Sequence, residues 1–172
     1  MTEISKISSR LKMEGQKTSE YFRSLPARAL DQQVYQTGSL WSVHDILAHF
    51  VSAEESFGKL IENIAAGGDG APRSLDIDEF NEDEVPGLAV NSSDYLLARF
   101  EQARLHTVAS VEVLENGDLE RVGYHPWFGE VELRKMLKLI YRHNMIHLRD
   151  IRRALQQKAP VPHLDINPRS AN

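Results

Sequence analysis

The sequence predicts an all-α fold, an antiparallel up-down four-helix bundle with a long acidic loop between its second and third helices. Four stretches repeat apolar residues at helical spacing, and turn-rich connections separate them. At 172 residues, with 41% apolar and 26% charged side chains, the chain fits one globular domain. We expect this bundle domain to span residues 1–160, followed by a C-terminal tail at 161–172.

The first predicted helix runs from about residue 2 to residue 25. It ends before Pro26, because proline disfavours a helical conformation in the residue that precedes it. A turn-rich connection that includes Gly38 leads to the second helix. The apolar stripe of the first helix consists of Ile4, Ile7, Leu11, Tyr21, Phe22 and Leu25.

The second predicted helix begins after Ser42 and reaches about Ala66. Ser42 is a good N-cap, and Asp45, three residues on, supplies the acidic partner of a capping box. The apolar stripe consists of Ile46, Phe50, Ala53, Phe57, Leu60 and Ile64.

Residues 67–91 break the helical pattern and predict the acidic loop. The segment holds four glycines and two prolines, and its seven acidic residues are opposed only by Arg73. A loop of this length is either a solvated excursion between helices or a lid or interaction surface.

The second half of the chain predicts two more helices. The third begins after Ser92 or Ser93, and the fourth spans roughly 131–157. Residues 115–130, between them, predict a compact loop with room for a short strand pair. The stripe of the third helix consists of Leu96, Phe100, Ala103, Thr107 and Val111.

Three histidines occupy positions where a bundle normally places aliphatic residues. His143 and His147 lie one turn apart on the apolar stripe of the fourth helix, and His49 lies beside the stripe of the second. A buried imidazole without a hydrogen bond costs about 1–3 kcal/mol, so the three share a need for partners. Residues four apart on a helix can converge on one ion. The sequence therefore indicates a three-histidine metal site, with hydrogen bonds alone as the alternative.

Composition narrows the chemistry and the partners. The chain has no cysteine, so any metal is held by nitrogen and oxygen, and a thiol reaction needs an external thiol. The net charge of −5, without a basic stripe, argues against nucleic acid. No signal peptide and no apolar run of about 18 residues is present, which argues against a membrane and makes the cytoplasm the expected location.

The other histidines are weaker ligand candidates. His44 is five residues from His49, which places it about 140° away around the helix, so both cannot easily reach one ion. His106 and His163 belong to a polar helix face and to the tail. His125, in the aromatic loop, is a candidate to line a pocket.

Three further residues are candidate helpers. Asp45 lies one turn before His49 and either orients that imidazole or serves only as the capping partner. Asn144 adjoins the histidine pair and can bind a ligand or the substrate. Trp127 either walls the pocket mouth or packs in its loop.

Several ordered motifs resemble one family. Residues 41–49, WSVHDILAH, resemble the start of the second helix in the DinB-like, or YfiT-like, metal-binding four-helix bundles, where a Trp-Ser-x-x-(Asp/Glu)-x-x-x-His signature ends in a metal ligand. Residues 125–133, HPWFGEVEL, resemble the entry to the family's last helix, and 143–151, HNMIHLRDI, its paired-histidine motif. Residues 78–81, DEFN, resemble a short element of its long loop.

The resemblance covers roughly residues 4–157 and implies a metal site. It implies a four-helix bundle, often a homodimer, with His49, His143 and His147 as ligands of a divalent ion such as zinc, nickel or manganese. All three ligand positions are filled in this chain.

Two reaction classes follow for a small-molecule substrate. A metal ion held by three histidines keeps a coordination position open. It can lower the pKa of a bound water to about 7, which suits a hydrolase, or it can activate a bound thiol. The resemblance to bacterial thiol-dependent S-transferases and maleylpyruvate isomerases implies a low-molecular-weight thiol as cosubstrate. The alternative is a non-catalytic bundle, a stress-response binding or sequestering protein whose metal stabilises the core.

Overall fold

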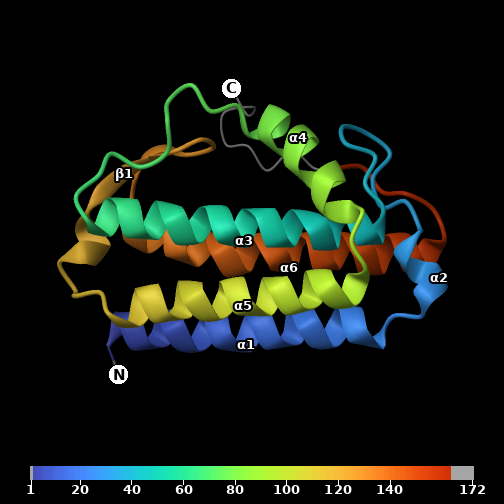
Figure 1. Ribbon diagram of the computed structural model, residues 1–172, viewed down its shortest axis with the longest axis horizontal. Helices are drawn as coiled ribbons and strands as arrows, with labels where there is room; N and C mark the ends of the chain where they lie inside the picture. The colour runs from blue at the N-terminus through green and yellow to red at the C-terminus, as the bar shows by residue number, and fades with distance from the viewer. Residues whose placement is uncertain (1, 164–172) are drawn as a thin grey trace.

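A computed structural model describes residues 2–163, so most of the predicted tail lies outside the described residues. Four long helices form a bundle, which confirms the predicted four-helix fold, and their ends agree with prediction to within about two residues (Figure 1). The long helices are α1 (Glu3–Ser24), α3 (Val43–Ala65), α5 (Ser93–Glu112) and α6 (Leu133–Gln157). Shorter elements are α2 (Ala27–Leu30), α4 (Ile77–Ala89), a 3-10 turn (Asp118–Glu120), β1 (Val122–His125) and β2 (Gly129–Glu132).

The order of the helices differs from a simple up-down bundle. Both α1 and α3 pack against α5 and α6, so consecutive long helices α1 and α3 are diagonal partners. The helices α3 and α5 run in the same direction, as two ion pairs show. Glu55 pairs with Arg99, and further along both helices Glu62 pairs with His106. The predicted up-down order is therefore wrong, and the chain runs up, down, down, up (Figure 1). The long segment between α3 and α5 allows this, because it returns the chain to the end where α3 began.

Part of the predicted acidic loop is helical. The Asp76 side chain caps α4 by accepting from the backbone N–H groups of Asp78 and Glu79. The buried residues of α4 are Asn81, Val85 and Leu88, spaced as one helical face that packs on α3. The loop prediction is therefore wrong for 77–89. Pro86 and the many acidic residues are typical of a loop, and the apolar stripe is too sparse to indicate a helix.

The strand pair expected within 115–130 is confirmed as the antiparallel hairpin of β1 and β2. Gly70 reaches this hairpin through a bridge to Tyr124. Its φ of 92° lies in the left-handed region, and an added Cβ would stand 2.5 Å from the backbone of Tyr124. Glycine at this position therefore lets the segment before α4 close against the hairpin.

A polar layer divides the bundle core into two apolar clusters. Along each long helix the apolar positions of one cluster give way to buried polar residues before the other cluster begins. The layer includes Thr18 of α1, His49 and Glu54 of α3, Arg104 of α5, and His143, Asn144 and His147 of α6. The three predicted metal ligands therefore lie at mid-bundle, between two apolar ends.

Among residues 2–163, no helix is both long enough and apolar enough to span a lipid bilayer.

Candidate metal centre

The three histidines predicted as ligands converge at one point inside the bundle. His49, from α3, and His143 and His147, from α6, are each at most 4% exposed. The Nε2 atom of His143 lies 2.8 Å from Nε2 of His49 and 3.1 Å from Nε2 of His147. The predicted juxtaposition of these side chains is therefore present in the fold.

The chemistry of this donor set fits a divalent cation. A neutral imidazole nitrogen either donates one hydrogen bond or accepts one. Because Nε2 of His143 faces two other Nε2 atoms, it cannot satisfy both contacts as a single donor or a single acceptor. One ion bound to all three lone pairs would satisfy them together, and three protein ligands leave a coordination position open for substrate.

Burial keeps the three imidazoles neutral. It lowers the pKa of His143 from 6.5 to about 4. Burial also lowers the pKa of His49 and of His147 well below 6.5, and the proximity of His143 adds to both shifts. Because metal binding requires unprotonated imidazole, the site is ready to bind at neutral pH.

The outward-facing ring nitrogens of His143 and His147 meet polar groups, as those of metal-binding histidines usually do, whereas Nδ1 of His49 is buried without a hydrogen-bond partner among residues 2–163. The hydroxyl of Tyr35 lies 2.5 Å from Nδ1 of His147, and Oδ1 of Asn144 lies 3.4 Å from Nδ1 of His143. Asn144, one of the candidate helpers, therefore contacts a histidine of the cluster. Tyr35 lies in the connection before α3, where no periodic pattern of apolar residues marks it as buried. Burial, and next the carboxylate of Asp150, raise the pKa of Tyr35, so its hydroxyl stays protonated.

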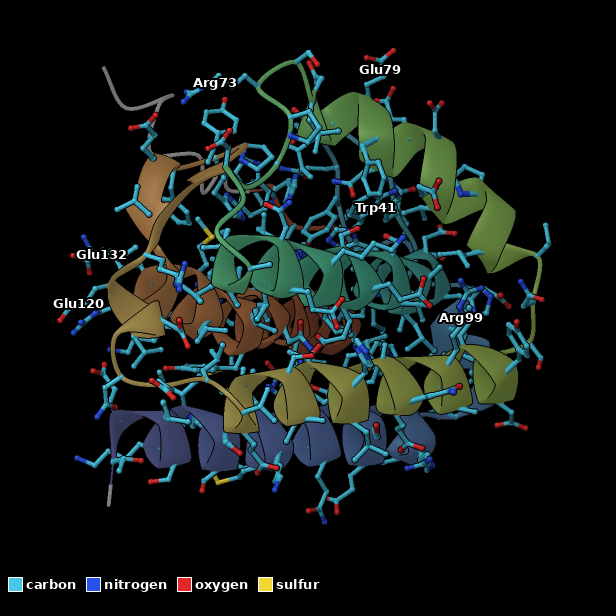
Figure 2. All side chains as sticks on the ribbon, turned by 60° about the vertical axis from the view of Figure 1, so that its left-hand side comes forward. Trp41, Arg73, Glu79, Arg99, Glu120 and Glu132 are labelled. Atoms are coloured by element: carbon cyan, nitrogen blue, oxygen red, sulfur yellow. The ribbon has the colours of Figure 1, made fainter. Side chains whose placement is uncertain are left out.

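Aromatic side chains fix the orientation of His49. Trp41 lies over its imidazole with ring centroids 4.6 Å apart and planes 31° apart. Phe50 approaches His143 and His147 edge-on at 5.9 and 5.7 Å. Figure 2 shows Trp41 between α3 and α4, whereas Glu79 points outward from α4. These contacts restrict ring rotation around the cluster.

Two cavities meet at the histidine cluster. The larger, about 480 Å³, reaches His49 and His143, and the smaller, about 330 Å³, reaches His49 and His147. They share His49, Asn81 and Trp127 in their walls. Apolar and aromatic residues of the larger cavity include Phe57, Leu60, Leu75, Ile77, Phe80 and Trp127. Polar residues of the smaller one include Thr37, Ser39, Asp78, Asn81, Glu82 and His163.

The remaining predicted helpers divide into two groups. Trp127 lines both cavities, and His125 lines the larger one, where it stacks on Phe57. The carboxylate of Asp45 binds the backbone N–H and the hydroxyl of Ser42, which completes the predicted capping box. The structure therefore supports the capping interpretation of Asp45 rather than the orienting one.

Of the three other histidines, His44 and His106 lie apart from the ligand cluster, whereas the ring of His163 stacks on that of His147 with centroids 6.1 Å apart. His44 bonds Ser93 and the carbonyls of Ala89 and Asn91, and so ties α3 to the turn before α5. His106 is exposed and pairs with Glu62. His163 lies against Tyr35, with ring centroids 4.2 Å apart, and lines the smaller cavity. The sequence assigned His163 only to the tail, because its approach depends on pairing of Val161 with Tyr35.

We expect His125 to contribute to acid sensitivity. Burial lowers its pKa from 6.5 to about 4, so below pH 6.5 the unfolded chain binds a proton that the folded protein does not. Stability therefore falls as the pH drops through this range, by at most about 1.4 kcal/mol per pH unit for one group. Urea denaturation of metal-free protein at several pH values should show that the free energy of unfolding falls less steeply with decreasing pH for His125→Gln than for the wild type. Equal pH dependence of the free energy of unfolding in the two proteins would contradict this assignment.

Solved structures of similar fold include two metal- or thiol-dependent proteins, and no curated protein sequence matches the chain. YfiT from Bacillus subtilis, described as a probable metal-dependent hydrolase with an unusual four-helix bundle topology, matches with a TM-score of 0.74 at 16% identity over 91% of this chain and 88% of YfiT. The mycothiol-dependent maleylpyruvate isomerase matches with a TM-score of 0.73 at 11% identity over 86% of this chain. This match covers 60% of the isomerase, so the chain spans less than two thirds of its length.

The sequence itself also matches a family model. The model describes the DinB superfamily and aligns with residues 10–151, a segment that contains all three histidines of the cluster. The motifs at 41–49 and 143–151 carried the same resemblance, which is confirmed. The chain belongs to the DinB superfamily.

Proposed function

We propose that this protein is a divalent-metal-dependent transferase that joins a low-molecular-weight thiol to a small electrophile. His49, His143 and His147 would hold the ion, for which zinc, nickel and manganese are the candidates. A divalent ion bound there would lower the pKa of a thiol placed beside it. The chain has no cysteine, so the thiol comes from a cosubstrate.

The observation that carries the proposal is the meeting of two cavities at one histidine cluster. A hydrolase needs room for one substrate and water, whereas a transferase must bring two organic molecules to the same point. The two cavities reach different pairs of the three histidines and share His49. Two molecules, one in each cavity, would therefore meet at the cluster.

The linings favour a particular assignment of the two substrates. The larger cavity, with Phe57, Phe80 and Trp127 in its wall, suits an apolar or aromatic electrophile. The smaller cavity offers the side chains of Thr37, Ser39 and Asp78, which suits a polar thiol. Trp127, in both walls, would separate the two ligands except at the cluster.

The reaction requires few steps from the protein. The sulfur of the thiol forms a bond to carbon, the leaving group departs with the bonding electrons, and the thiol proton passes to solvent. His125 accepts the backbone N–H of Trp127 at Nδ1, so its neutral ring carries the proton on Nε2. From the wall of the larger cavity, His125 can donate a hydrogen bond to an acceptor atom of the electrophile.

We expect turnover of a haloaromatic such as 1-chloro-2,4-dinitrobenzene only when metal and thiol are both supplied. The assay follows absorbance of the thioether with cysteine, glutathione and other bacterial thiols, each against metal-free protein. Trp127→Ala should lower kcat/KM about tenfold or more, because it opens the wall that positions both ligands. Phe128→Ala, at an exposed neighbour, is the matched control.

Other outcomes of this assay point elsewhere. Metal-dependent release of acid from esters or amides without thiol would favour a hydrolase, as the description of YfiT suggests for that protein. Tight metal binding without turnover under any of these conditions would favour the non-catalytic bundle. Either result would reject the transferase.

The assembly and location are parts of the same proposal. The family resemblance supports a homodimer of bundle domains spanning about residues 1–160, and we propose the cytoplasm as its location. Multi-angle light scattering of the full chain checks the dimer, with a monomer mass of 19.5 kDa as the contrary result.

A further inference from the structure

Tyr35 is held rigidly beside the histidine cluster. It is completely buried, although it lies in the irregular connection between α2 and α3. The chain on either side of it pairs with Val161, whose N–H donates to the carbonyl of Val34 at 2.8 Å and whose carbonyl accepts from Gln36 at 3.1 Å. This pairing fixes the backbone of Tyr35, so its hydroxyl reaches the cluster at a defined point.

The hydroxyl of Tyr35 faces two groups of α6. It lies 2.5 Å from Nδ1 of His147, and the negative charge of the Asp150 carboxylate acts on it electrostatically. Asp150 is 2% exposed, and Arg149 binds its Oδ1 through Nε at 3.0 Å and Nη2 at 2.9 Å. The carboxylate is therefore anchored behind the tyrosine.

The direction of the hydrogen bond between Tyr35 and His147 decides which nitrogen of His147 carries the proton. The buried carboxylate of Asp150 attracts the hydroxyl proton of Tyr35, so the hydroxyl oxygen is left to accept from Nδ1–H of His147. Nε2 of His147 then presents a lone pair toward His143, 3.1 Å away. The opposite direction would place a proton on Nε2, inside the cluster, and block metal binding.

We propose that Tyr35 and Asp150 are positioning residues that hold His147 as its Nδ1–H tautomer and so prepare the three-histidine site for a divalent ion. The inference rests on the metal-binding part of the proposed function and is independent of the reaction. The counterpart at His143 is weaker, because Asn144 lies 3.4 Å from its Nδ1. The contribution of Tyr35 should therefore be the largest of the outer contacts.

The first test is zinc affinity of the full chain, measured by competition with a chromophoric chelator at pH 7. Tyr35→Phe keeps the ring and its packing but removes the hydroxyl, and we expect a dissociation constant about 10- to 100-fold weaker. Tyr21→Phe is the matched control, because Tyr21 is a partly buried tyrosine that packs on Phe22 and should leave zinc affinity unchanged. A wild-type affinity for Tyr35→Phe would overturn the proposal.

A double-mutant cycle tests whether the two residues act as one chain. As a single substitution, Asp150→Asn should weaken zinc binding. In the Tyr35→Phe background it should weaken zinc binding further by about twofold or less, because the connection from Asp150 through Tyr35 to His147 is already broken. If the two single-variant losses of zinc affinity multiplied in the double variant, the two residues would act independently, and a joint effect on His147 would be rejected.

The tautomer of His147 can be observed directly, and a purely structural role of Tyr35 would not change it. Long-range ¹H–¹⁵N spectra of metal-free wild-type protein should show His147 with its proton on Nδ1. Observation of the Nε2–H form would overturn the proposal, even if Tyr35→Phe failed to fold. Absence of zinc binding by the wild type would reject the proposed metal site, while the spectrum would still decide the role of Tyr35 and Asp150.

Discussion

Substitution of His143 by alanine is expected to remove the bound metal altogether. Its Nε2 atom lies within 3.1 Å of the corresponding atoms of both His49 and His147, so it is the central member of the cluster. The variant would keep two ligands, which form a much weaker site than three. Elemental analysis of protein purified without a histidine tag should find about one metal ion per wild-type chain and less than about a tenth of that in His143→Ala.

His106→Ala is the control for this measurement. His106 is an exposed histidine of α5 that pairs with Glu62, so its removal should leave the metal content unchanged. The metal-free forms of both variants should be compared by circular dichroism to show that they remain folded. Equal metal content in His143→Ala and the wild type would exclude the proposed site.

Among single substitutions of buried residues, Arg104→Ala is expected to cause the largest loss of stability. Arg104 and Glu54 are 4% and 1% exposed at their side chains, and they form two hydrogen bonds of 2.7 Å. Arg104 also donates to the carbonyl of Leu11 at 2.9 Å. The substitution leaves the Glu54 charge buried without its partner, which costs about 3–5 kcal/mol. Urea denaturation of the metal-free protein measures the change.

Arg99→Ala provides a control with the same chemistry on the same two helices. Arg99 pairs with Glu55 through two hydrogen bonds of 2.6 and 3.0 Å, but both side chains are about one third exposed. Exposed pairs contribute up to about 1 kcal/mol, because water solvates the remaining charge. Similar losses for Arg99→Ala and Arg104→Ala would show that burial does not decide the strength of these pairs.

The long helices were predictable because their signals are local. Helical spacing of apolar residues, the capping box of Ser42 and Asp45, and Pro26 after the first helix all act within a few residues. The helix α4 was missed because its stripe of Asn81, Val85 and Leu88 contains only two apolar side chains. Its stability comes from packing on α3, which no local pattern reports.

The order of the helices was not predictable from the same signals. Periodicity identifies the buried face of a helix but not its neighbour, so the up-down arrangement was only the simplest choice. The partners of Arg104 show the consequence. The charge of Arg104 is buried because α5 runs parallel to α3 and places it opposite Glu54.

By itself, the sequence determined the all-α class, the four bundle helices and the three inward histidines, since each depends on spacing along one helix. Only the tertiary structure decided the up, down, down, up order, the approach of His49 to His143, and the two cavities that meet there. It also brought Tyr35 to His147 across 112 residues of chain. These features depend on packing between distant segments, and the free energy of such contacts is not encoded in any one local pattern.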